Sequence, residues 1–247
     1  MGVKVVANDI IAPWNSRVIP PVTRGLRGWF TFDTDAGRFK LNRAIGGTDA
    51  VMVGTPVAYS THGRFKGGVN YLQTNIEETD EQTILVVGKA VALPASSADG
   101  AFYVGNYNGN SKTPGYTGSA FGTSIFHQSP TTLTAGAGRD NGSGVATSGQ
   151  IGLTVTPTSW ALRAMRTKSL VPTDIYNLTT GAKASSSNAL ARVLAESNYR
   201  IGSATTLFSG EVDISAVAIY DKYLSDDEIA QVATAMRRRM TRLGITV

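Results

Sequence analysis

The chain has 247 residues, a formal net charge of +5 and no cysteine. The absence of cysteine excludes disulfides and thiolate metal sites as supports of the fold. Basic residues are spread along the chain apart from the run Arg237–Arg239, so the charge lacks the compact patch that is typical of a nucleic-acid interface.

Residues 1–24 predict an extended arm, which is followed by a single domain over residues 25–247. Three prolines in the arm remove backbone hydrogen-bond donors and favour extended conformations, although the stretch is too apolar for a free tail. Such an arm packs either on its own domain or on a neighbouring subunit, and in the second case the protein is a homo-oligomer or part of a larger assembly. The candidate partner-binding residues of the arm are Ile10, Ile11, Trp14 and Arg17.

The N-terminus lacks the charged and apolar regions of a signal peptide, and no apolar run in the sequence is long enough to span a membrane. We therefore expect synthesis in a cytoplasm, with no membrane insertion and no classical secretion.

The next segments predict strands. Residues 25–33, GLRGWFTFD, suit the first strand of a β-sandwich because they offer large apolar side chains for a core. Residues 34–74 alternate turn signals with short apolar runs, a spacing that predicts a meander. Residues 83–92, TILVVGKAVA, form an apolar run that predicts a strand in the centre of a sheet.

Residues 93–150 combine low charge, many glycines and several tyrosines, and of all parts of the sequence they most resemble ligand-binding loops. One interpretation is a sugar site in which aromatic rings stack and polar groups form hydrogen bonds. The other is structural, because aromatic rings also fill a sandwich core and Asn-Gly pairs form hairpin turns. The candidate ligand-binding residues are Tyr103, Tyr107, Asn108, Tyr116, Asp140 and Asn141, with His127 beside them.

Residues 210–220 predict a further strand, in which apolar residues alternate from Val212 to Tyr220. The opposite side of this strand is polar at first and becomes apolar toward its end. We therefore expect a strand that starts near a solvent-exposed edge and ends buried on both faces.

A helix is predicted over about 225–243. Ser225 and Glu228 have the spacing of a capping box, and Leu224 is placed to pack on Ile229. Acidic residues in the first turn and arginines near the last suit the helix dipole.

Several segments resemble the concanavalin A-like lectin/glucanase superfamily, and in particular its laminin G-like jelly-roll domains. They are the opening GLRGWFTFD, KLNRAIGGTDAVMVGTP and GRFKGGVNYLQT, the hairpin-like stretch 160–181, and the closing glycine-led strand followed by LSDDEI. The resemblance implies an all-β, two-sheet antiparallel jelly-roll β-sandwich with one C-terminal helix.

Some members of this superfamily are glycoside hydrolases with a Glu-x-Asp-x-x-Glu strand. Here Glu211 and Asp213 match its first two acidic positions, and Ala216 stands where the second catalytic glutamate is needed. Retaining hydrolysis requires two carboxyl groups about 5 to 5.5 Å apart. We therefore expect no enzyme and no catalytic residue.

No metal and no cofactor are expected. The acidic run Glu77, Glu78, Asp80 and Glu81 lacks the spacing of a calcium loop and predicts a solvated loop. The two histidines, His62 and His127, lie in unrelated stretches and do not form a zinc set.

Two classes of function follow. The first is a non-enzymatic structural or attachment protein: free-standing domains that resemble this one are found in tailed bacteriophages as head-decoration, tail or receptor-binding components, which implies a virion location and other virion subunits as partners. The alternative is a carbohydrate-binding, lectin-like module whose loops 99–150 bind a cell-surface glycan. A polysaccharide hydrolase or lyase is a second alternative.

Overall fold

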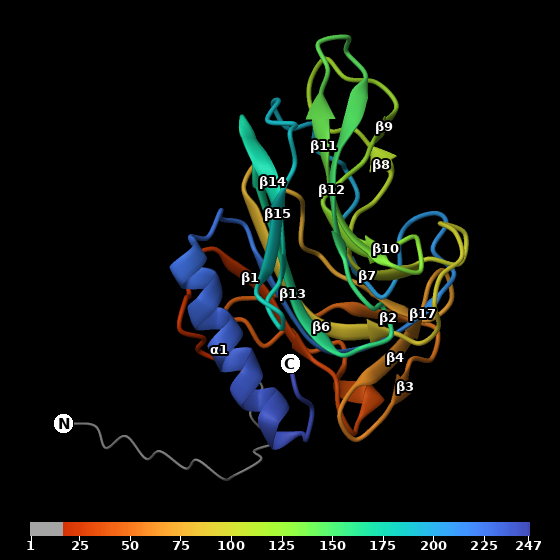
Figure 1. The fold of residues 1–247 in the computed structure, drawn as a ribbon, viewed down its shortest axis with the longest axis vertical. Helices are drawn as coiled ribbons and strands as arrows, with labels where there is room; N and C mark the ends of the chain where they lie inside the picture. Colours follow the sequence, from red (N-terminus) through yellow and green to blue (C-terminus); the bar gives the residue numbers. More distant parts are fainter. Residues whose placement is uncertain (1–16) are drawn as a thin grey trace, which may run out of the picture.

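The computed structural model describes residues 17–247, which form two large antiparallel sheets and one α-helix (Figure 1). The larger sheet has the order β15 (Ala182–Ser185), β14 (Val171–Asn177), β13 (Ala161–Lys168), β6 (Gln82–Ala90), β17 (Glu211–Tyr220), β4 (Gly63–Lys66) and β3 (Val57–Ala58), and β1 (Leu26–Thr31) also pairs with β17. This architecture confirms the predicted all-β sandwich with a C-terminal helix.

The smaller sheet forms the second layer. Its order is β12 (Ala146–Thr154), β11 (Thr132–Asp140), β10 (Ser124–His127), β7 (Ala101–Gly105), β16 (Arg200–Ile201), β5 (Tyr71–Gln73) and β2 (Val51–Val53). The remaining elements are the pair β8 (Gly109–Asn110) and β9 (Ser119–Ala120), the 3-10 turn η1 (Ala36–Arg38) and the helix α1 (Asp226–Arg242).

The predicted meander over residues 34–74 is wrong. The chain crosses between the layers here, so that β2 and β5 join the smaller sheet whereas β3 and β4 join the larger one. The predicted central strand is confirmed, since β6 lies between β13 and β17. The main core fills the space between the sheets, where the rings of Phe32, Phe39 and Phe65 pack with centroids 5.0 to 5.8 Å apart.

A bulge divides β17 into two halves. Val212 and Ile214 face the core between the sheets, but the register shifts at Ser215, and from there Ala216 and Tyr220 face the helix. The predicted alternation through residue 220 is therefore wrong beyond Ser215, because one extra residue moves every later side chain to the opposite face. The expectation that this strand begins near solvent and ends covered on both faces is confirmed.

The helix α1 covers the second half of β17 and the strands beside it. Its capping box is present: the side chain of Ser225 accepts from the N–H of Glu228, whose carboxylate accepts from the N–H of Ser225. Its buried stripe consists of Ile229, Val232, Ala233, Met236 and Met240, and it packs on outward residues of β6, β13 and β17. None of the helices in residues 17–247 has the length and apolar character needed to cross a bilayer.

The described end of the arm contacts its own domain. Arg17 donates to the carbonyls of Asn42 and Ala44, Val22 is buried beside α1, and Arg24 Nε lies 2.5 Å from Glu228 Oε1. Ile10, Ile11 and Trp14 lie outside the described residues. The partner-binding role of the arm stays a prediction.

The cap of α1 gives a testable prediction. Ser225→Ala should lower the free energy of unfolding by about 1 kcal/mol, because it removes the acceptor for a backbone donor in the first turn. The control Gln231→Ala changes an exposed position in the same helix and should stay within about 0.5 kcal/mol of the wild type. Equal effects of the two substitutions in urea unfolding would contradict the role of the cap.

Candidate functional site

The structure separates the tyrosines of the 93–150 region. Tyr103 lies on β7, fully buried between the sheets, where the guanidinium of Arg163 lies 4.9 Å from its ring centroid. Tyr107 is half-buried against an aromatic cluster that includes Phe126 and Phe208, at 5.8 and 5.3 Å between ring centroids. Both side chains thus contribute to packing.

Three other predicted residues come together at the turn between β11 and β12. The hydroxyl of Tyr116 bonds to Asp140 and lowers the pKa of that carboxyl, and the N–H of Gly142 donates to Asp140 at 2.6 Å. Asn141 accepts from the N–H of Ser143 and so stabilises the turn. Asn108 lies apart from them, with a φ of 63° in a turn before β8. The ligand-binding role of the six residues stays a prediction, and each has a local structural partner or turn role here.

His127 is a core residue. Its Nδ1 donates to the carbonyl of Thr132 at 2.8 Å, its ring packs on Tyr103, and its Nε2 has no hydrogen-bond partner among residues 17–247. Burial, together with the nearby charge of Arg163, lowers the pKa of His127 to about 3. The imidazole is therefore neutral in the folded protein at ordinary pH.

The predicted solvated loop is only partly correct: Glu77 and Asp80 of the acidic run are exposed, whereas Glu78 is buried. Glu78 and Arg192 are both fully buried and form an ion pair, to which Thr123 and the N–H of Ala195 add hydrogen bonds. Glu77 is exposed and pairs with a lysine at the surface. No group of side chains able to hold a metal ion is present among residues 17–247.

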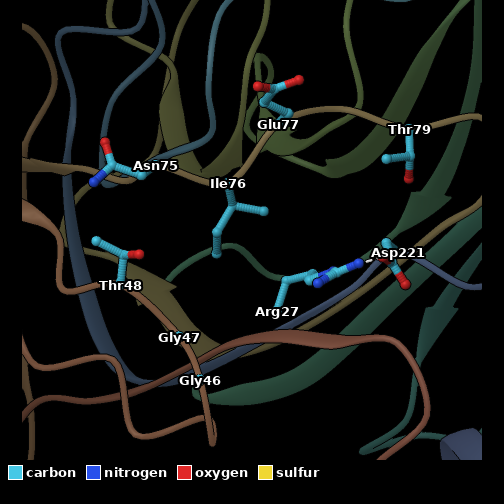
Figure 2. Close-up of a pocket in the computed structure, with 9 residues that line it drawn as sticks. All are labelled: Arg27, Gly46, Gly47, Thr48, Asn75, Ile76, Glu77, Thr79 and Asp221. Carbon is cyan, nitrogen blue, oxygen red and sulfur yellow. Dashed lines mark hydrogen bonds and ion pairs between the residues drawn. The ribbon is translucent and has the colours of Figure 1, made fainter.

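A cavity of about 290 Å³ lies between the loops beside β1 (Figure 2). Arg27 reaches across it to Asp221, with 2.5 Å between Nε and Oδ2, and Ile76 and Glu77 line another part of its wall. Its lining contains no aromatic side chain, and none of the predicted ligand-binding residues contributes to it. The cavity offers little for a ring to stack on.

A set of aromatic and charged side chains lies on the outer face of the larger sheet, beyond the end of α1. We call it the Asp213 surface. It is formed by Tyr59, His62, Arg64, Lys89, Trp160 and Asp213.

Cross-strand pairing brings the charges of this surface together. Asp213 on β17 pairs with Arg64 on β4 and with Lys89 on β6, so the three side chains project from neighbouring positions on one face. The side chain of Asp213 is only 1% exposed. Arg64 binds both of its oxygens, at 2.8 Å from Nε to Oδ1 and 3.1 Å from Nη2 to Oδ2. This geometry fixes the carboxylate and the guanidinium in place.

The aromatic rings form a row beside these charges. Tyr59 stacks on His62 with ring centroids 4.6 Å apart, and His62 meets the edge of Trp160 at 5.2 Å. Lys89 Nζ lies 5.5 Å from the centroid of the Trp160 ring, and Tyr59 is 39% exposed. Burial lowers the pKa of His62, although Asp213 acts in the opposite direction, so the ring is neutral at pH 7.

The Asp213 surface was not predicted from the sequence. Its residues come from four separate segments, and only the pairing of β4, β6 and β17 unites them. A signal was nevertheless present: Lys89 interrupts an otherwise apolar strand, and Asp213 occupies a strand that is otherwise mostly apolar. Charges within central strands indicate partners across the sheet.

No protein-family model matches the chain, and no curated protein matches it. Among solved structures, Trypanosoma rangeli sialidase in complex with the inhibitor DANA is similar, with a TM-score of 0.59 and 14% identity over 90% of this chain and 34% of that chain. The receptor binding domain of botulinum neurotoxin D has a TM-score of 0.58 and 13% identity over 86% of this chain and 54% of that chain.

The binding domain of botulinum neurotoxin DC in complex with SialylT is also similar, with a TM-score of 0.58 and 10% identity over 86% of this chain and 52% of that chain. This protein therefore spans only about a third to a half of the structures that it matches. At such low identities the likeness shows a shared fold, a β-rich sandwich, and nothing finer.

The buried ion pair gives a second prediction. Glu78→Gln should lower the free energy of unfolding by about 3 kcal/mol, because it leaves the guanidinium of Arg192 buried without a counter-charge. Glu77→Gln is the matched control, since Glu77 is 70% exposed, and it should cost less than about 1 kcal/mol. Similar losses for the two variants in urea unfolding would argue against the buried pair.

A third prediction concerns pH. The folded state keeps the imidazole of His127 neutral. The contribution of His127 to stability is therefore complete above the pKa of about 6.5 that this side chain has in the unfolded chain, and it is lost as the pH falls toward 3. The free energy of unfolding should fall by about 2 kcal/mol between pH 7 and pH 5 through this residue.

His127→Gln removes the titrating group and should flatten this part of the stability profile. Parallel profiles for the variant and the wild type would show that protonation of His127 is not the cause.

Proposed function

We propose that this protein is a non-enzymatic carbohydrate-recognition module that attaches to a glycan through the Asp213 surface. The observation that carries the proposal is the row of aromatic rings beside fixed hydrogen-bonding charges, on a part of the sheet that α1 does not cover. An aromatic ring gives a flat apolar surface for the C–H face of a sugar, and adjacent charged groups bind its hydroxyls.

The rigidity of the surface supports recognition. Asp213 and Arg64 hold each other through two hydrogen bonds, and the edge of Trp160 packs near His62 while its ring also contacts the helix-side core. Side chains that are already ordered lose little conformational entropy when a ligand binds. The three elements that carry them, β4, β6 and β17, are hydrogen-bonded neighbours in one sheet.

Two of the similar structures agree with a carbohydrate ligand. One is a sialidase and the other is a toxin binding domain in complex with SialylT. These two structures support the class of ligand, whereas the place of binding rests on the residues of this chain.

The absence of catalysis is part of the proposal. Arg64 already occupies both oxygens of Asp213, and Ala216 lies buried beneath α1. The strand therefore lacks the second carboxyl group that a retaining hydrolase of this kind needs. A structural or attachment role in a virion is the other class of function expected from the sequence, and it rests on the sequence resemblance alone.

A glycan array followed by calorimetry tests the proposal. The wild-type protein should bind at least one saccharide, and Tyr59→Ala and Trp160→Ala should each weaken that binding by about tenfold or more, because they remove the stacking surface. Catalysis is tested in parallel by incubating the same saccharide with the protein and measuring cleavage, which should not occur.

Tyr71→Ala is a matched control, since Tyr71 also has an arginine near its ring, Arg200 at 5.0 Å, but lies on the smaller sheet. It should leave the affinity unchanged. A wild-type protein that binds no saccharide, or an equal loss on Tyr71→Ala, would overturn the proposal.

A further inference from the structure

The charges on the Asp213 surface and directly beside it do not cancel. Five charged side chains occupy outward positions at this end of the larger sheet: Arg64, Lys66, Lys89, Glu211 and Asp213. Lys66 lies opposite Glu211, and Arg64 lies opposite Asp213, so each carboxylate has a cation across the strand pair. Lys89 is the remaining positive charge.

Lys89 also has unused hydrogen-bonding capacity. Its ammonium carries three donors, and within residues 17–247 it makes no hydrogen bond: its nearest carboxylate oxygen, Asp213 Oδ2, lies 3.8 Å away. Arg64 already binds that carboxylate. The side chain of Lys89 is 30% exposed and lies over the ring of Trp160, so a ligand can reach the ammonium and the ring together.

From this geometry we infer that the ligand of the Asp213 surface is an acidic saccharide, whose carboxylate binds Lys89 while its ring packs beside Trp160. The inference rests on the proposed function and names the class of sugar that it takes. Because His62 is neutral, the five charged side chains carry a surplus of one positive charge. A single surplus charge suits one carboxylate, whereas a nucleic-acid backbone requires contacts to many phosphates.

The carboxylate has two common sources in glycans, namely sialic acids and uronic acids. Both present a carboxylate on a six-membered ring, and the surface as described fits this shared chemistry. Two matched probe pairs, whose members differ only in the charge of the carboxyl group, separate them from each other and from neutral sugars: sialyllactose with its methyl ester, and trigalacturonate with its methyl ester.

Calorimetry with these four probes tests the inference on the wild-type protein without any substitution. The acidic member of at least one pair should bind about tenfold more tightly than its neutral partner, because a charge-assisted hydrogen bond is added. Equal affinities within both pairs would overturn the inference and leave the proposed function standing. Binding of none of the four probes would overturn the inference, and the glycan array then decides the proposed function separately.

Two substitutions locate the charge that is responsible. Lys89→Gln should remove the preference, so that the acidic and neutral members of a pair bind equally well, while Lys66→Gln, which changes a neighbouring exposed lysine, should preserve the preference. A Lys89→Gln protein that keeps the full preference would contradict the inference. If that variant does not fold, Lys89→Met provides the same test, since methionine retains the packing of the lysine stem on Trp160.

Discussion

The packing of α1 on only part of the larger sheet divides the outer face of that sheet into an apolar part beneath the helix and a polar part beyond it. The helix covers the second half of β17, where Ala216 and Tyr220 face it. In the first half, where α1 does not pack, Glu211 is partly exposed and Asp213 is buried beneath its charged and aromatic neighbours. The bulge at Ser215 separates the halves, and Arg239 near the end of α1 bonds to the hydroxyl of Ser215 at 2.9 Å. The outward side chains of one strand are thus apolar where they pack under α1 and polar beyond the bulge.

Buried charges hold other parts of the sandwich in place. The ion pair of Glu78 and Arg192 joins loops that are far apart in the sequence, and Arg139 on β11 is fully buried with hydrogen bonds to the carbonyls of Lys168 and Val171. Each of these groups is costly to bury alone and is stable only with its partners in place. These contacts order the loops, whereas the Asp213 surface leaves an ammonium without a hydrogen bond.

The local features of the fold were predictable from sequence, because they depend on neighbouring residues. The capping box of Ser225, the covered end of β17 and the central position of β6 all follow from patterns within a few residues. The bulge, the crossing of β2 and β5 to the smaller sheet, and the burial of Glu78 depend on contacts between distant segments. The Asp213 surface was not predictable for the same reason, since four segments supply its residues and only strand pairing brings these segments together.

The place of ligand binding is the central claim, and backbone amide chemical shifts measured by NMR during titration with the tightest-binding saccharide test it most directly. We expect the largest shift changes at Arg64, Lys89 and Asp213, on the part of the larger sheet that α1 does not cover. Changes confined to the turn at Asp140 and Asn141 would contradict it and would place the ligand on the loops between β7 and β12.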